Sequence, residues 1–401
     1  MTPEGTLVKL PFLTADLKAI RLKLGDLSSG RDNNLNLIRM LAAYAVLISH
    51  SYALTAGTGD AEPGRGSIGL SVGAIAVHVF FLASGFLVSA SLLSRQSVIE
   101  FAWARALRIV PALLVMLVLV ALVLGPLYTS LPLGAYLRNG QTWEYMLRNS
   151  VPVARMSYEL PGVFQENPYG PAVNGSLWTL PYEVRMYLAL ALLWVAAGWA
   201  QGARAGGLFV GLVVLGALLS GCHLLAAHFG LASVSEWSAL GFMFFAGASF
   251  YAFRQRVTLT WLGFLAVLIC WALTIRHPAL FFPVYIMTLG YALFFLAYVP
   301  GGIVRGYNRF GDISYGIYIY AFPVQQAVVA SIPGASVMMV IVVSTLVTVP
   351  LAMLSWHLVE KRALNLKVGA VGFTRRCLGR ASPARSVSAT SNVKGPQKPG
   401  P

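Results

Sequence analysis

Two ionisable side chains lie in one apolar segment of the chain, LIRMLAAYAVLISH, at residues 37–50. Arg39 and His50 are eleven residues apart. On an α-helix this spacing is about 20° more than three full turns, so both side chains project from one face, roughly 16 Å apart along the axis. Such a pair suits a long ligand with an anionic group at one end and a reactive group at the other. The alternative is structural: Arg39 reaches lipid phosphates and His50 bonds to a neighbouring helix.

A second group of polar residues lies in SLWTLPYEVRMYL, residues 176–188. Its proline favours a helix start, which places Glu183 in the first turn, where the helix dipole stabilises a carboxylate. Tyr187 follows four residues later on the same face. We expect Glu183 at a membrane depth similar to that of His50, where a carboxylate can fix the tautomer of an imidazole and raise its basicity. Alternatively, Glu183 pairs with Arg185 or lies among lipid headgroups.

Two arginines lie three residues apart in FAWARALRIVP, residues 101–111. Arg105 and Arg108 therefore share a helix face, and paired guanidinium groups suit the binding of phosphate. The alternative is that they only mark the cytoplasmic end of a membrane span, where basic residues accumulate without any ligand.

Other polar residues of the apolar segments are better explained by structure than by catalysis. Ser84 lies in HVFFLASGFLVSASLL (78–93), where small neighbours favour close helix packing, and no base lies beside it in the sequence. His78, in the same segment, is ambiguous for the same reason. At the end of the last apolar segment, His357 and Glu360 predict a salt bridge or a lid contact.

The composition places these residues in a membrane protein. Of 401 residues, 57% are hydrophobic and 11% are charged, whereas a soluble domain usually has about 25% charged residues. The hydrophobic residues form runs of roughly 18 to 25, long enough to cross a bilayer. Backbone in lipid must satisfy its own hydrogen bonds, which predicts helices. We expect an all-α integral membrane protein of about ten transmembrane helices, near 35–55, 69–93, 107–128, 178–200, 206–226, 238–253, 258–275, 279–299, 312–332 and 335–358.

Basic residues indicate the orientation of these spans. They precede the first span, lie between the second and third, fall in later alternate loops and continue after the last span. With an even number of spans they share one side, which the positive-inside rule makes cytoplasmic, with both termini in the cytoplasm. The loop at 129–177, on the opposite side, is too short for a catalytic domain but long enough to cover a site.

The chain divides into three parts: a cytoplasmic N-terminal segment (1–32) with a weak amphipathic pattern, one membrane domain (33–362), and a basic tail (363–401) that we expect to be disordered. The net charge of +15 comes mostly from topology and this tail, so we expect no nucleic-acid partner. The three cysteines lack the spacing of a zinc site or a disulfide framework, and we expect no metal.

These segments together resemble the acyltransferase-3 family of bacterial membrane proteins over the whole membrane domain. The first element is Arg39 followed by His50. The others appear in the family's order: FFLASGF (80–86), RALRIVP (105–111), SLWTLPYEVRMY (176–187), FGDISYGIYIY (310–320) and VEKR (359–362). Six elements in order, at consistent membrane depths, make the resemblance specific.

The resemblance implies a multi-pass enzyme of the bacterial inner membrane. Such an enzyme moves an acyl group, most often acetyl, from cytoplasmic acyl-CoA to a hydroxyl of a surface carbohydrate or glycolipid. The donor is a substrate, so no bound cofactor is implied. Catalytic residues would be His50, Glu183 and Tyr187. Residues that bind acyl-CoA would be Arg39, Arg105 and Arg108. Supporting positions would be Asn36, Ser84 and Trp178.

Three features depart from the family pattern. Asn36 stands where many members carry Asp, three residues before the arginine. Ala321 stands where many carry His, which removes a polar group. No SGNH-type hydrolase domain follows the membrane part in this sequence, so transfer would be completed by the membrane domain or by a separate partner.

Acyl-CoA carries its phosphates and its thioester at opposite ends, as the spacing of Arg39 and His50 requires. His50 would take the proton of a sugar hydroxyl as that hydroxyl attacks the thioester. Glu183 would orient His50, and Tyr187 would bond to the acceptor or the oxyanion; a transient acyl-His50 is the variant.

Two rival classes of polytopic membrane protein compete with this interpretation. One is a transporter or flippase of an anionic or glycolipid substrate, which predicts internal repeats, and none is visible. The other is a glycan polymerase or ligase, which should carry a large outer loop with several catalytic arginines or acids. The loop at 129–177 is a modest match to that requirement.

Overall fold

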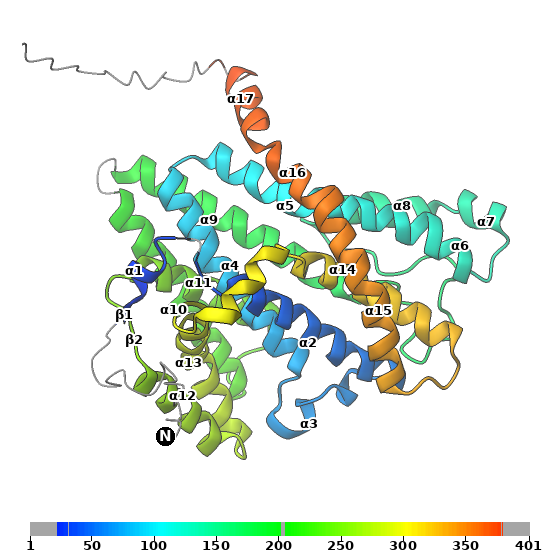
Figure 1. Ribbon diagram of the computed structural model, residues 1–401, viewed down its shortest axis with the longest axis horizontal. Coiled ribbons are helices and arrows are strands. Elements are labelled where there is room, and N and C mark those ends of the chain that lie inside the picture. The colour runs from blue at the N-terminus through cyan, green and yellow to red at the C-terminus, as the bar shows by residue number, and fades with distance from the viewer. Residues whose placement is uncertain (1–21, 31, 202–204, 378, 380–401) are drawn as a thin grey trace, which may run out of the picture.

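The computed structural model describes residues 22–30, 32–201, 205–377 and 379 (Figure 1). Over these residues the protein is almost entirely helical, and two short strands, β1 (Leu22–Lys23) and β2 (Thr258–Leu259), pair antiparallel. The long helices are α2 (Leu35–Ala56), α4 (Val72–Arg95), α5 (Val98–Leu119), α9 (Leu180–Gln201), α10 (Ala205–His228), α11 (Glu236–Ala252), α12 (Trp261–Thr274), α13 (Pro278–Tyr298), α14 (Ser314–Ser331) and α15 (Val337–Ser355). The shorter helical elements are α1 (Leu24–Leu27), η1 (Gly59–Ala61), α3 (Arg65–Ile68), η2 (Val120–Leu124), α6 (Gly125–Tyr128), α7 (Leu133–Arg138), α8 (Gly140–Ser150), η3 (Gly175–Thr179), η5 (Gly302–Phe310), η6 (Trp356–Glu360), α16 (Lys361–Asn365) and α17 (Lys367–Cys377).

Each segment expected to cross the membrane overlaps one of the long helices; the largest displacement is that of α5, which begins nine residues before the predicted 107–128. Among the described residues, seven helices are long and apolar enough to span a bilayer, which confirms an all-α, multi-pass membrane protein. The remaining three are α11, with 17 residues, α12, with 14, and α14, with 18. The count of ten spans and the cytoplasmic side of the termini stay predictions. The amphipathic pattern before residue 22 lies outside the described residues.

Local sequence sets where several of these helices begin and end. The side chains of Ser71, Ser97, Thr260 and Ser336 each accept a hydrogen bond from a backbone N–H of the following first turn. Each bond satisfies a donor that the helix itself leaves free. At the other end of a helix, α2 stops at Gly57, whose φ of 78° lies in the left-handed region that favours glycine.

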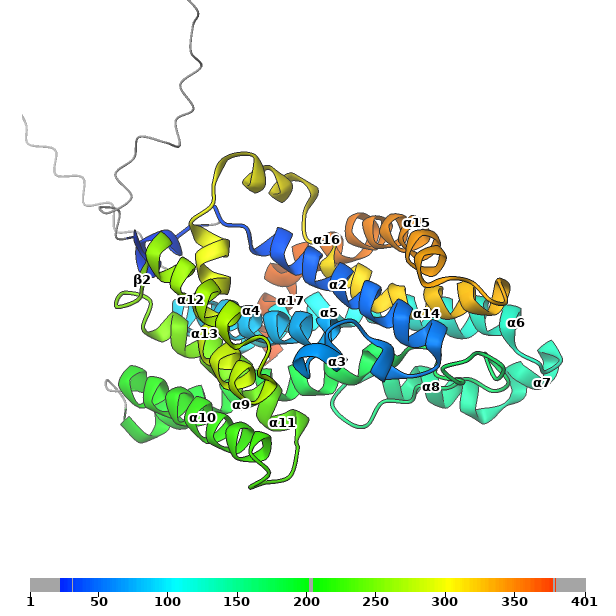
Figure 2. The ribbon, with the colours of Figure 1, turned by 90° about the horizontal axis from the view of Figure 1, so that it is seen from below.

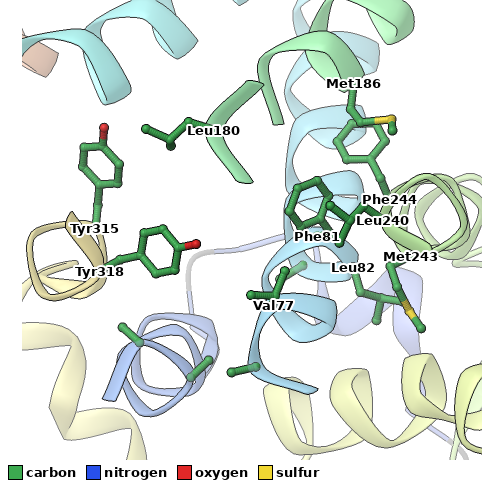
Figure 3. Close-up of a cluster of buried hydrophobic side chains, with 14 of the residues drawn as sticks. Val77, Phe81, Leu82, Leu180, Met186, Leu240, Met243, Phe244, Tyr315 and Tyr318 are labelled. Atoms are coloured by element: carbon green, nitrogen blue, oxygen red, sulfur yellow. The ribbon is translucent and has the colours of Figure 1, made fainter. Parts of the chain in front are cut away.

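Helices α4 and α11 cross at two glycines. A Cβ atom on Gly85 would lie 1.9 Å from the backbone oxygen of Phe244, and a Cβ atom on Gly247 would lie 2.0 Å from that of Leu82. Figure 3 shows buried side chains of both helices meeting around this crossing. The two backbones therefore approach closely, as they do where small residues face each other in membrane proteins. The packing role expected for segment 78–93 is observed.

Helices α14 and α15 lie beside α2 (Figures 1 and 2). We call the end of this group that carries Arg39 the arginine end, and the end that carries His50 the histidine end. At the histidine end, the backbone oxygens of Gly170 and Ala172 accept hydrogen bonds from Gln326 of α14 at 3.1 and 2.7 Å. The loop that we expected to cover a site is thus held against α14.

The chain after the last span is helical further than expected. After α15 and η6 the chain continues as α16, which begins at Lys361, and as α17, which ends at Cys377 (Figure 1). The part of the range 363–401 up to Cys377, predicted to be disordered, is therefore largely helical. Trp103 of α5 donates a hydrogen bond to Thr374 at 2.9 Å, and Val371 is buried. The prediction is wrong where these helices lie, because composition indicates disorder but contacts with α5 order the segment. Residues 380–401 lie outside the described residues.

Replacing Gly85 by Ala is expected to destabilise the bundle. The added Cβ has no room against the backbone of Phe244, so α4 and α11 must separate, and overpacking of this kind costs about 1–3 kcal/mol. The melting temperature of the detergent-purified protein should fall. The control is Gly211→Ala, in α10, where a Cβ meets no atom within 4 Å; it should leave the melting temperature unchanged or raise it. Equal melting temperatures for Gly85→Ala and the native protein would contradict the close crossing.

Candidate active site

Four charged side chains form one network at the arginine end. Asp312 pairs with Arg39 of α2 at 2.5 Å and with Arg108 of α5 at 2.7 Å. Arg108 also pairs with Glu360 at 2.7 Å. The salt bridge expected around Glu360 is therefore observed, and Arg108 is its partner. The network joins parts of the chain that are more than two hundred residues apart in sequence.

Asp312 reaches both arginines from the turn between η5 and α14. The preceding Gly311 has a φ of 81°, a conformation that favours glycine. Ser314, at the start of α14, donates a hydrogen bond to the carboxylate at 2.5 Å. The guanidinium groups of Arg39 and Arg108 and the bond from Ser314 all favour the ionised form of this carboxylate.

Glu360 reaches the same network because α15 does not continue as a regular helix. The turn η6 is π-helical, a conformation that recurs at functional sites. Glu360 is fully buried, and its second oxygen accepts a hydrogen bond from Ser355 at 3.0 Å. Both oxygens of this buried acid thus have partners, as a buried charge requires.

A cavity of about 560 Å³, the arginine-end chamber, opens beside the network. Its polar lining residues are Asn36, Arg39, Ser84, Ser91, Arg95, Arg105, Arg108, Thr179, Glu183, Tyr187, Asp312, Tyr315 and Tyr318. Of the three arginines expected to bind phosphate, Arg39 and Arg108 are already paired with acids. Arg105 forms no ion pair within the described chain, and its buried Nε has no hydrogen-bond partner there. Arg105 is thus the one of the three whose charge is available to a ligand.

Glu183 and Tyr187 lie in the arginine-end chamber. Glu183 accepts a hydrogen bond from the Tyr187 hydroxyl, as expected for residues four apart on a helix. The same hydroxyl lies 2.8 Å from the hydroxyl of Ser84 on α4. Ser84 therefore takes part in a polar cluster in addition to its place in the packed segment. The guanidinium carbon of Arg105 lies 5.8 Å from the centre of the Tyr187 ring.

His50 lines a different cavity of about 290 Å³, the histidine-end chamber. Its polar and aromatic lining residues are His50, Glu62, Arg65, Ser71, His78, Tyr169, Trp178, Glu236, Tyr318 and Phe322. The His50 ring packs edge-on to Phe322, with centroids 5.3 Å apart, and its buried Nδ1 has no hydrogen-bond partner among the described residues. By contrast, Nδ1 of His78 bonds to Tyr285 at 3.0 Å. His50 therefore keeps a ring nitrogen inside this chamber that no residue of the described chain binds and that can accept a proton.

Glu62, and not Glu183, lines the chamber of His50. Glu62 follows η1 and reaches the histidine-end chamber from that turn. Ser49 donates to its carboxylate at 2.6 Å and accepts from the backbone N–H of Gly73 at 3.0 Å, which fixes its position. The structure does not bring Glu183 beside His50, because Glu183 faces the other chamber. Sequence spacing places a residue along its own helix, but it fixes neither the depth of one helix against another nor which neighbouring helix a side chain faces.

The two chambers meet at a thin partition. Val77 and Tyr318 line both of them, and Figure 3 shows Tyr318 extending from α14 toward α4, on which Val77 lies. The Tyr318 hydroxyl lies 2.7 Å from that of Thr179. Side chains, and not backbone alone, therefore make this part of the partition.

Asn36 and Trp178, which the sequence suggested as supporting positions, line different chambers. Asn36 lines the arginine-end chamber and donates to Asn308 at 3.1 Å, and Trp178 lines the histidine-end chamber. Sequence reasoning did not single out Asp312 or Glu62. Arginines in apolar spans require buried acids as partners, so the Asp of FGDISYGIYIY could have been found in this way. Glu62 carries no comparable signal.

A helical bundle whose polar side chains line internal chambers defines a multi-pass membrane protein with its site inside the bundle. The model of the family described as the acyltransferase domain matches residues 32–357. The chain therefore belongs to the acyltransferase-3 family and is a membrane acyltransferase.

Two known proteins are similar to this chain over most of their length. An O-acetyl transferase of Shigella phage Sf6 is 30% identical over 349 residues, which are 84% of this chain and 97% of the relative. Nodulation protein 10 of Rhizobium leguminosarum bv. viciae is 29% identical over 374 residues, 86% of this chain and 96% of the relative. No solved structure matches the chain.

Replacing Asp312 by Asn should destabilise the arginine end. Arg39 and Arg108 would lose the carboxylate that they share, and removing one partner of a buried pair costs about 3–5 kcal/mol. We expect a lower melting temperature in mild detergent and a smaller monodisperse fraction in size-exclusion chromatography. Asp60→Asn, at an exposed position, is the matched control and should behave as the native protein. An Asp312→Asn protein as stable as this control would show that the network is dispensable.

Proposed function

We propose that this protein transfers an acyl group, most simply acetyl, from acyl-CoA to a hydroxyl of a carbohydrate or glycolipid in the bacterial cytoplasmic membrane. The arrangement along α2 carries the proposal. Arg39 and His50 lie on one helix, and each lines one of two chambers that meet at Val77 and Tyr318. A donor and an acceptor can then approach from opposite ends of the bundle and meet at the partition. The O-acetyl transferase relative supports acetyl as the group.

The donor would bind from the arginine end. Arg95, Arg105 and the basic residues of α16 and α17 lie at this end, and such an excess of basic residues supports its cytoplasmic location. Arg105, which has no acid partner within the described chain, would bind a phosphate of the donor. The pantetheine arm would extend through the arginine-end chamber, and the thioester would reach the partition.

His50 would act as the general base. As the acceptor hydroxyl oxygen attacks the thioester carbonyl, His50 takes its proton; collapse of the tetrahedral intermediate breaks the C–S bond, and the imidazolium returns the proton to the departing CoA thiolate. The carboxylate of Glu62 would stabilise the transient imidazolium. The paired hydroxyls of Tyr318 and Thr179, at the partition, would donate to the oxyanion.

The histidine-end chamber has the composition expected for a carbohydrate acceptor. Tyr169, Trp178 and Phe322 offer apolar ring faces to a sugar ring, while Glu62 and Glu236 offer oxygens that accept hydrogen bonds from its hydroxyls. Glu183 and Tyr187 lie in the other chamber, so we assign them to the donor side, where they would contact the pantetheine arm.

Two adjoining chambers would also fit a transporter or flippase of an anionic or glycolipid substrate. Such a protein would move its substrate past the partition without forming a covalent bond. Membership of the acyltransferase-3 family favours the enzyme, and a direct assay of acyl transfer separates the two functions.

The decisive assay follows isotope-labelled acetyl from acetyl-CoA into surface glycan, in membrane vesicles that carry the native protein or His50→Ala. Loss of the general base should lower transfer by about 10²–10⁴-fold at equal protein level. His277→Ala, at an exposed position that lines neither chamber, is the control and should transfer as the native protein does. Equal labelling by His50→Ala would make His50 structural. No labelling by any variant would favour the transporter.

Glu62→Gln tests whether Glu62 positions and stabilises His50. Loss of a charged partner of the imidazolium is expected to lower kcat by about 10–100-fold and to leave KM for acetyl-CoA unchanged, since the donor binds in the other chamber. Glu62→Asp should recover part of the rate. A purely structural role would instead lower the melting temperature of Glu62→Gln and change kcat and KM together.

A further inference from the structure

A third cavity, of about 860 Å³, lies between α17 and the junction of α4 and α5. We call it the α17 cavity. Its charged lining residues are Arg95, Glu100, Lys367, Arg375 and Arg376. Arg95 and Leu364 also line the arginine-end chamber, so the two cavities are neighbours with shared walls.

The charges of the α17 cavity do not balance. Its single acid, Glu100, lies 3.1 Å from Arg375, 3.7 Å from Arg95 and 3.8 Å from Lys367. Arg376 is a fourth cation on the same wall. One carboxylate therefore faces four cations, so the lining residues carry an excess of three positive charges. A cavity of this charge favours a ligand with several negative charges.

Helix α17 is held in place by contacts outside this group of charges. Trp103 of α5 donates a hydrogen bond to Thr374 at 2.9 Å, and Val371 is buried. Val368, Val371 and Leu364 also give the cavity an apolar side. The cavity thus combines cations for phosphate with apolar surface for a ring, within the size range of about 300–1,000 Å³ usual for small-molecule sites.

We infer that the α17 cavity binds the 3′-phosphorylated adenosine diphosphate part of acyl-CoA, an inference that rests on the proposed function. The adenosine and its 3′-phosphate would lie under α17, the diphosphate would reach the shared wall at Arg95 and Leu364 toward Arg105, and the pantetheine arm would continue into the arginine-end chamber. A lipid phosphate is the other source of the same chemistry. The nucleotide is favoured because this cavity adjoins the chamber that leads toward His50.

A steric pair of variants tests the site without changing charge. Gly372 lines the cavity, and a Cβ added there meets no atom within 4 Å, so the side chain of Gly372→Leu would occupy the cavity. Gly369 lies on the same helix, is exposed and lines no cavity, so Gly369→Leu is the matched control. In phosphatidylcholine nanodiscs, Gly372→Leu should bind adenosine 3′,5′-bisphosphate at least about tenfold more weakly than the native protein. Gly369→Leu should bind it as the native protein does.

A charge pair of variants tests which group recognises the phosphates. Lys367→Gln and Arg375→Gln should each weaken binding of the bisphosphate by about tenfold and should reduce the preference for CoA over dephospho-CoA. Arg362→Gln, an exposed position of α16 outside the cavity, should change neither. Native affinity in Gly372→Leu, Lys367→Gln and Arg375→Gln would overturn the inference.

The same variants, extracted from membranes that contain both phosphatidylglycerol and phosphatidylcholine, separate the other outcomes. If they bind the bisphosphate normally but lose the native protein's enrichment of co-purified phosphatidylglycerol over phosphatidylcholine, the cavity holds a lipid headgroup and the inference is wrong. Another outcome is that native membranes transfer acetyl and bind CoA while every α17 variant binds CoA with the native affinity and transfers acetyl at the native rate. That result would support the proposed function and would contradict only the nucleotide site under α17. If native protein binds no CoA and transfers no acetyl, the proposed function fails first.

Discussion

The carboxylate of Asp312, shared by Arg39 and Arg108, is the interaction on which the rest of the structure depends. It joins α2 and α5 to the start of α14, and Arg108 extends the network to Glu360 after α15. Charges withdrawn from water into a helical bundle are stable only when they are paired. The ends of these helices must therefore meet in one arrangement, and that arrangement sets the wall of the arginine-end chamber.

Pairing also separates structural cations from those that can bind a ligand. Arg39 and Arg108 are held by acids, whereas Arg105 lines the same chamber with no acid partner in the described chain. The α17 cavity continues the pattern, since one acid, Glu100, faces several cations. Cations thus outnumber acids in the α17 cavity, and Arg105 adds a further cation without an acid partner in the arginine-end chamber of the described chain. This excess of positive charge would direct an anionic donor into the bundle.

The polar interior contrasts with the outer face of the helices. Large apolar residues such as Leu192, Trp199, Leu262 and Leu273 are strongly exposed, which would be unfavourable in water but suits contact with lipid chains. His50, Glu62 and the acids of the arginine end lie inside, where polar side chains can find partners or a ligand. The low dielectric around these groups strengthens every interaction they make with a substrate.

The sequence by itself determined the class of fold, the approximate course of the long helices and the positions of polar residues along each helix. Apolar runs of spanning length must be helical because lipid offers no partners for the backbone. Spacing alone placed Arg39 and His50 along one helix and paired Glu183 with Tyr187. Only the tertiary structure decided which helices face each other, because their rotation and contact depend on close packing such as that of Gly85 and Gly247. For this reason the acid beside His50 is Glu62, the acid between the arginines is Asp312, and α17 is ordered.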